Sequence, residues 1–316
     1  MVLYHWINYF IGVQWPYYDY LRFLTPSFIF ISGFMVSHVY LSKYEAADPH
    51  LSMRLISRGA KLLGVFLVLN VARDAVAPLS GNGIVLRSLI SPRFLVRFFI
   101  FGDLPADGPK LVSFSILVPI SYLLMASGLL MIPYRRYRYT FHTACCALFL
   151  ASVILGYANA RNYNLEFVAI GMLGLIIGFA PIKAIDRCGR HPYLLASSFL
   201  VYLVAITVWG VPFALLIVAV LLNLCLLYLL GAKGAMPDTI RNETILLGKY
   251  SLLGYISQVA ILQLMSRAYN HVHVGIFRLP SSFVMAVALT ILVVELVDRI
   301  RERSRSSDRL YRAIFA

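Results

Sequence analysis

Long runs of apolar residues recur along almost the whole chain, with short polar stretches between them. Residues 212–231, for example, read PFALLIVAVLLNLCLLYLLG and contain no charged side chain. Crossing the roughly 30 Å of hydrocarbon in a bilayer takes about 20 such residues as a helix. A strand of a membrane barrel needs only about ten alternating residues. The length of the runs therefore predicts membrane-spanning α-helices.

Applied along the chain, this rule predicts one all-α membrane domain over residues 1–316, a bundle of about ten transmembrane helices. With 60% hydrophobic and only 13% charged residues, the chain cannot be a water-soluble globule, in which about 25% charged residues is usual. We expect no second domain. The expected spans are 1–14 (short), 22–41, 60–78, 112–132, 140–158, 166–182, 192–209, 212–231, 246–266 and 280–298.

The positive charges are distributed unevenly between the loops. Most of the 28 Lys and Arg residues follow even-numbered spans or lie in the tail, residues 299–316. Because Lys and Arg concentrate on the cytoplasmic side of membrane proteins, both termini are predicted to be cytoplasmic. Glu295 and Asp298 close the last span beside the basic tail, and we expect them to be charge partners. The net charge of +14 lies between apolar spans, which favours a lipid bilayer and argues against nucleic acid as the partner.

Metal chemistry has little support in the sequence. The cysteines Cys145, Cys146, Cys188 and Cys225 show neither metal-ligand spacing nor a disulfide framework. The pair His271-x-His273 in an outer loop lacks a carboxylate or a third ligand nearby. We therefore predict no metal site.

The first apolar range carries a histidine, His5. Ionisable groups inside a bilayer cost energy, usually face a bundle interior or a wet cavity, and often mark functional sites. At 1.5 Å per residue, His5 lies about 13 Å from the outer end of its range, close to the midplane. With an ordinary pKa of about 6.5, a neutral ring is available as a general base. A lone histidine can equally hydrogen-bond a neighbouring helix, and the residues alone leave both interpretations open.

A basic cluster precedes the third span. Arg54, Arg58 and Lys61 are spaced i, i+4 and i+7, which places them on one helix face at the cytoplasmic edge of the membrane. One interpretation is ordinary anchoring at the membrane surface. The other is binding of the phosphates of a nucleotide-containing donor such as an acyl-CoA, because Arg pairs with phosphate through two parallel hydrogen bonds.

Two polar pairs mark the outer ends of spans. Asp19 and Arg22 lie in an aromatic turn at headgroup level and are expected to pair, either as anchors or as groups that hold an extracytoplasmic acceptor. Arg73 and Asp74 end the third span and either compensate each other or face a polar cavity. The longest outer loop, residues 79–111, is the best candidate for acceptor access, with its centre expected to lie amphipathically on the outer leaflet.

Four stretches together resemble a known family. Residues 2–6, VLYHW, and residues 28–34, FIFISGF, resemble the opening of the membrane-bound acyltransferase-3 superfamily, which reads hydrophobic-Tyr-His and then Phe-hydrophobic-Ser-Gly-Phe. Residues 113–120, SFSILVPI, resemble the inner-helix motif of its glucan succinyltransferase and heparan-glucosaminide N-acetyltransferase branches. Residues 247–255, LGKYSLLGY, resemble the late Gly-x-x-Ser-x-x-x-Tyr segment of the superfamily.

The resemblance implies an acyltransferase of a bacterial inner membrane. Such an enzyme moves an acetyl or succinyl group from cytoplasmic acyl-CoA, its co-substrate, to a hydroxyl or amine of an envelope or exported carbohydrate. His5 would be the general base, or a nucleophile that carries the acyl group briefly, and the basic cluster would bind the donor. Ser32 would hydrogen-bond within the site and Gly33 would open room beside His5. The alternative for this pair is close helix packing, as is common for small residues in membranes.

The chain also departs from the family. The family places an arginine upstream of the histidine, whereas only four residues precede His5 here, so either the start codon is misplaced or that arginine is missing. Gln258 stands where the family often has a histidine. Two alternatives remain open: a transporter or flippase, although no matching pair of interrupted spans is visible, and a non-catalytic relative.

Overall fold

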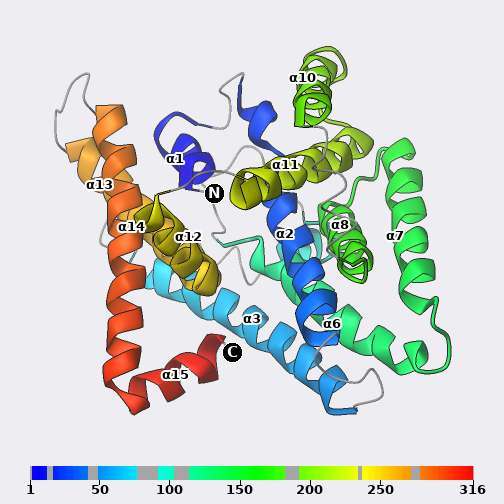
Figure 1. Cartoon of the computed structure of the whole chain (residues 1–316), viewed down its shortest axis with the longest axis horizontal. Helices are drawn as coiled ribbons and strands as arrows, with labels where there is room; N and C mark the ends of the chain where they lie inside the picture. The colour runs from blue at the N-terminus through cyan, green and yellow to red at the C-terminus, as the bar shows by residue number, and fades with distance from the viewer. Residues whose placement is uncertain are drawn as a thin grey trace.

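The structure is a computed structural model of the chain. It describes residues 2–12, 17–41, 49–76, 92–102, 114–181, 192–233, 237–271 and 278–315. These residues form helices and turns, with no strand among them (Figure 1). The predicted all-α class is confirmed for this part of the chain.

Two of the helices, α2 and α5, continue directly into wider helical turns, η2 and η4. In chain order the elements are α1 (Val2–Phe10), η1 (Tyr18–Leu21), α2 (Leu24–Met35), η2 (Val36–Leu41), α3 (Pro49–Val76), α5 (Pro92–Leu95), η4 (Val96–Phe101), α6 (Leu117–Tyr134), α7 (Thr140–Tyr157), α8 (Tyr163–Gly178), α10 (Pro192–Trp209), α11 (Phe213–Lys233), α12 (Asp238–Lys249), α13 (Ser251–His271), α14 (Arg278–Arg303) and α15 (Arg305–Phe315).

Long apolar helices make the chain an integral membrane protein. Within the described ranges, seven stretches are long and apolar enough to cross a membrane, or eight if the bent pair α12 and α13 is one span. Their outward faces are apolar as well: on α10, Leu200 and Val204 are 63% and 64% exposed. Contiguous apolar surfaces of this kind are rare on soluble monomers and indicate contact with lipid.

Each of the ten expected ranges contains a helix, but three do not form a full straight span. α1 has nine residues and α8 has 16, fewer than the roughly 20 that cross a bilayer. The expected span 246–266 contains a 93° bend, because α12 ends at Lys249 and α13 starts at Ser251. α3 differs in the other direction, since it begins at Pro49 rather than at residue 60. The count of ten crossings and the side of the termini remain predictions.

The packing of α2 against α8 depends on small residues. Gly33 of α2 lies so close to the backbone of Gly171 that a Cβ atom would overlap the Gly171 carbonyl, and Gly174 abuts the Phe30 carbonyl in the same way. Small residues let membrane helices approach closely, so the packing interpretation of Gly33 is confirmed. Gly33 faces α8, and the expectation that it opens room beside His5 is wrong.

α2 stands at the centre of the molecule, with α13 and α14 to one side of it and α7 to the other (Figure 1). One buried cluster joins α2, α3, α6 and α8 with Tyr255 of α13. A second joins α2 and α8 with α10 and α11. A third, around Leu262 and Met265, joins α13 and α14 with α1. The short first helix is therefore held against α13 and α14, which fixes the position of His5.

Candidate functional site

His5 lies where α1 meets α13. Its half-buried ring stands 5.6 Å from the ring of Tyr255 on α13 and makes an edge contact at 5.4 Å with its neighbour Tyr4. Tyr4 in turn stacks at 5.1 Å on Tyr18 of η1. The histidine is thus held in a frame of aromatic rings between the first helix, the following turn and a helix from the far end of the chain.

Tyr255 joins the four stretches that resemble the family, because it belongs to one of them and contacts a residue from each of the other three. Besides His5, its buried ring meets Phe28 of α2 at 6.2 Å and Phe114, just before α6, at 6.1 Å. Phe114 has a φ of 62°, a left-handed backbone that is unusual for a bulky residue. Strained residues of this kind cluster at functional sites. Stretches far apart in sequence therefore converge at one ring.

Polar side chains continue this contact along α1 and α13. His5, Asn8 and Tyr9 share one face of α1, and the Gln263 carboxamide of α13 donates to the Tyr9 hydroxyl at 3.0 Å. Gln258 lies between Tyr255 and Gln263 on α13 and is 3% exposed. We call the four residues His5, Asn8, Tyr255 and Gln258 the polar seam; the hydrogen-bonded pair Tyr9 and Gln263 lies beside it and joins α1 to α13. A histidine with amide and hydroxyl groups beside it, shielded by apolar helices, can move a proton and bind a polarised carbonyl.

Ser32, the second predicted site residue, uses its proton inside α2. Its hydroxyl donates to the Phe28 carbonyl oxygen at 2.9 Å, one turn back on the same helix. Phe28 is itself part of the ring cluster around Tyr255. Ser32 therefore lies one turn from that cluster, and its prediction as a substrate-binding group stays a prediction.

The predicted outer pairs have different outcomes. Asp19 and Arg22 form an ion pair of 3.1 Å with both side chains about half exposed, so the pairing is confirmed. Asp19 lies in η1 and Arg22 directly follows it, and Tyr18 of the same turn stacks on Tyr4 of α1. Arg73 lies in the last turn of α3. The side chain of Asp74, and most of the outer loop 79–111, lie outside the described residues, so the prediction for that pair is not decided.

The described part of that loop, residues 92–102, packs on α3 and α8, and its position on the outer leaflet stays a prediction. Phe98 of η4 is 2% exposed and stacks on Phe66 of α3 at 5.5 Å. Asn164 of α8 donates to the carbonyl oxygens of Phe98 and Phe99 at 2.9 and 3.0 Å. Close by, Glu166 is 3% exposed on its side chain and pairs with Arg161 at 3.1 Å. Hydrogen bonds to α8 and ring stacking on α3 therefore hold η4 against the bundle.

The basic cluster lies on one helix, as predicted. Arg54, Arg58 and Lys61 all belong to α3, with Arg54 and Lys61 exposed. The Arg58 guanidinium lies over the ring of Tyr40, with 4.9 Å to its centroid, which ties this part of α3 to η2. The shared face is compatible with either surface anchoring or phosphate binding.

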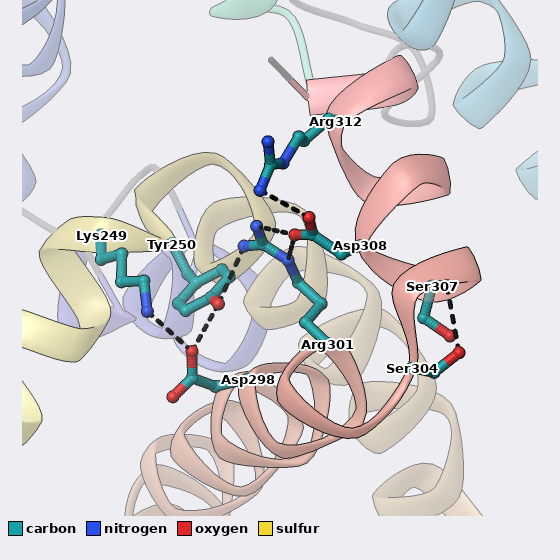
Figure 2. Close-up of polar contacts among 8 residues, drawn as sticks. All are labelled: Lys249, Tyr250, Asp298, Arg301, Ser304, Ser307, Asp308 and Arg312. Atoms are coloured by element: carbon teal, nitrogen blue, oxygen red, sulfur yellow. Dashed lines mark hydrogen bonds and ion pairs between the residues drawn. The ribbon is translucent and has the colours of Figure 1, made fainter.

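A second polar centre, which we call the ion cluster, joins α12, α14 and α15 (Figure 2). Asp298 accepts hydrogen bonds from Lys249 at 2.9 Å and from the Tyr250 hydroxyl at 2.5 Å. Arg301 donates to the Tyr250 hydroxyl at 2.8 Å and binds Asp308 through two nitrogens. Asp298 and Glu295 were both predicted to be charge partners, and each is: Glu295 pairs with Arg299 at 3.0 Å.

The ion cluster folds α15 back onto the bundle. The Ser304 hydroxyl between α14 and α15 accepts the Ser307 N–H, which caps the new helix. The Arg301 guanidinium lies 3.9 Å from the centroid of Tyr311. Hydrogen bonds from Arg301, with a further one from Arg312, hold the pKa of the Asp308 carboxyl below its ordinary value. Burial raises the pKa of the Tyr311 phenol. The predicted basic tail is thus a docked helix.

A hollow of about 490 Å³ opens on the other face of α1. Leu3 and Ile7 line it and point away from the face that carries His5. Its walls are apolar and aromatic throughout, which suits a hydrocarbon chain. The lining residues are Leu3, Trp6, Ile7, Ile11, Tyr17, Tyr20, Leu21 and Leu203.

Sequence reasoning missed most of the ion cluster and the partners within the seam. The Asp308 and Arg312 pair could have been found from its i, i+4 spacing. The contact between Arg301 and Tyr250 has no such local signal, since it depends on the bend between α12 and α13. No signal in the sequence marks the left-handed Phe114. In the part of the chain that the structure describes, no group of three or more His, Cys, Asp or Glu side chains could hold a metal ion.

Comparison with known proteins adds no relative. No protein-family model matches the chain, and no curated protein and no solved structure is detectably similar to it.

Proposed function

We propose that the protein is a membrane-embedded acyltransferase that moves an acetyl or succinyl group from acyl-CoA to a hydroxyl or amine of an envelope or exported carbohydrate. One observation carries the proposal: His5, Phe28 and Phe114 meet at Tyr255, and each comes from a stretch that resembles the same family. Convergence at one place is what a shared site requires, and helix packing alone does not demand it.

His5 is the general base of the proposed reaction. Its ring takes the proton of the acceptor hydroxyl while the hydroxyl oxygen attacks the thioester carbonyl carbon. The carbon–sulfur bond then breaks, and the leaving thiolate takes the proton back from His5. The products are an acylated carbohydrate and the free thiol of CoA, so no further reactant is needed.

The other groups have supporting roles in the proposal. Arg54, Arg58 and Lys61 bind the donor phosphates from the cytoplasm. Asp19 and Arg22 hold the carbohydrate at the outer side, close to α1. The proposal also includes ten membrane crossings, cytoplasmic termini and location in a bacterial inner membrane.

The test follows label from acyl-CoA into membrane fractions. Membranes with the wild-type chain or His5→Ala at matched levels receive acetyl-CoA or succinyl-CoA labelled in the acyl group, and carbohydrate, lipid and protein fractions are counted. Loss of a general base should reduce transfer by about 10²- to 10⁴-fold. His142→Ala is the matched control, because His142 is an exposed histidine on α7, and it should leave transfer unchanged. Wild-type transfer that survives in His5→Ala refutes the proposal.

A second candidate, a transporter, is favoured by one observation. The 93° bend between α12 and α13 resembles the broken helices from which transporter sites are built. Among the described residues it is the only bent pair of this kind. Uptake of a labelled sugar by vesicles without acyl transfer would favour transport, whereas His5-dependent labelling of the carbohydrate favours the enzyme.

A further inference from the structure

The carboxamide of Gln258 stands out within the polar seam. The side chain is 3% exposed, and its Nε2 finds no hydrogen-bond partner among the described residues. Buried amide groups almost always have partners, because a buried N–H without a partner loses its hydrogen bonds to water and forms none in their place. A donor of this kind is costly to keep unless something binds to it.

The face of α13 that carries Gln258 is turned toward α1. Tyr255, Gln258, Leu262 and Met265 follow at intervals of three, four and three residues and therefore share one helix face. Tyr255 contacts the His5 ring, and Leu262 and Met265 belong to the cluster that packs on α1. Gln258 lies between these contacts, one turn from the residue that touches His5.

Gln263 is the natural comparison, because it is the same residue on the same helix and also faces α1. Its Nε2 donates to the Tyr9 hydroxyl at 3.0 Å, so it holds the two helices together. Gln258 makes no such bond to α1. The two glutamines therefore differ in the use of one atom, and that difference separates a packing role from a binding role.

We propose that Gln258 donates a hydrogen bond from Nε2 to the carbonyl oxygen of the acyl group that is transferred at His5. This inference rests on the proposed function. When the acceptor oxygen attacks, the carbonyl electron pair moves onto that oxygen, and a donor fixed in a dry site stabilises the resulting negative charge. The charge returns to form the carbonyl again as the thiolate leaves. Gln258 thus carries no proton and forms no covalent bond.

Stability and transfer should change in opposite directions in Gln258→Leu. Replacing a buried unpaired donor by an apolar side chain of similar size leaves the melting temperature unchanged or raises it. Loss of one donor to the charged oxygen should lower kcat by about 10²- to 10³-fold, with little change in KM for acyl-CoA. Gln263→Leu is the matched control: it loses a made hydrogen bond, so its melting temperature should fall while kcat changes far less.

The experiment uses the full-length protein in lipid nanodiscs, with labelled acetyl-CoA or succinyl-CoA and the acceptor fraction found for the wild type. Melting temperature, kcat and KM are measured for Gln258→Leu, Gln263→Leu and His5→Ala. Gln258→Leu with kcat within about threefold of wild type, or with a clearly lower melting temperature, overturns the inference while His5 dependence leaves the proposed function standing. Transfer that does not depend on His5, or that is absent from the wild type, overturns both.

Discussion

The polar seam, between α1 and α13, and the ion cluster, at the bend between α12 and α13, are two polar regions that differ in how their hydrogen bonds are used. In the ion cluster, Asp298, Arg301 and Asp308 each bind charged or hydroxyl partners. In the seam, a buried donor of Gln258 has no partner among the described residues. A polar network in which every donor and acceptor is hydrogen-bonded makes a structure rigid. A fixed donor that remains available to a ligand is typical of a binding site. We therefore assign a structural role to the ion cluster and a role in the reaction to the polar seam.

The largest effect is expected from a substitution where α2 packs on α8. Gly33→Val places a branched side chain against the Gly171 backbone, where even a Cβ would overlap, so α2 must move away from α8. Overpacking of this kind costs about 3 kcal/mol. Because α2 carries Phe28, the ring cluster at Tyr255 should be disturbed as well. The melting temperature in nanodiscs and the rate of acyl transfer should both fall.

Gly64→Ala is the control for that change. Gly64 lies within α3 with no atom within 4 Å of a new Cβ, so the substitution should be neutral or stabilising by up to about 1 kcal/mol. If both substitutions lower the melting temperature equally, close packing of α2 on α8 is not what supports the seam.

The next effect concerns the ion cluster. Arg301→Met removes the hydrogen bonds to Tyr250 and Asp308 from a side chain that is 17% exposed, which should cost about 1–3 kcal/mol. Hydrogen exchange over residues 305–315 should rise as α15 is released. Arg309→Met, an exposed arginine of α15, should leave exchange unchanged. If acyl transfer falls as far as in His5→Ala, the cluster takes part in chemistry and the division between the two regions fails.

The sequence predicted the helical class because backbone groups in hydrocarbon must be satisfied within each segment, and run length alone then indicates helices. It also predicted the pair of Asp19 and Arg22, which is local. The meeting of His5 with Tyr255 and the approach of Gly33 to Gly171 were out of reach, since they depend on how helices distant in sequence dock. The bend at Tyr250 was missed because an apolar run does not show where a helix turns.

Acid should release α15 from the bundle, whereas pH changes near neutrality should leave its docking unchanged. The pKa of Asp308 is lowered from 3.8, chiefly by its hydrogen bond from Arg301, so its contribution is present above that value and is lost as pH falls through the lower folded pKa. The pKa of Tyr311 is raised from 10.0 by burial, so its contribution is present below that value and is lost only at higher pH. The protection factors of the α15 amides, which are the exchange rates corrected for the pH dependence of free amides, should therefore stay constant between about pH 5 and 9. A transition inside that window would show that another group controls docking.

The smallest effect is expected from Arg312→Ala, which removes the second arginine on Asp308. The Arg312 side chain is 69% exposed, whereas that of Arg301 is 17% exposed. An exposed ion pair is screened by water and contributes below about 0.5 kcal/mol, so melting temperature and exchange over α15 should barely change. Arg301 remains bound to both Asp308 and Tyr250 in this variant. A loss equal to that of Arg301→Met would mean that charge number, rather than a shielded hydrogen-bond network, holds α15, and the contrast with the seam would then rest on Gln258 alone.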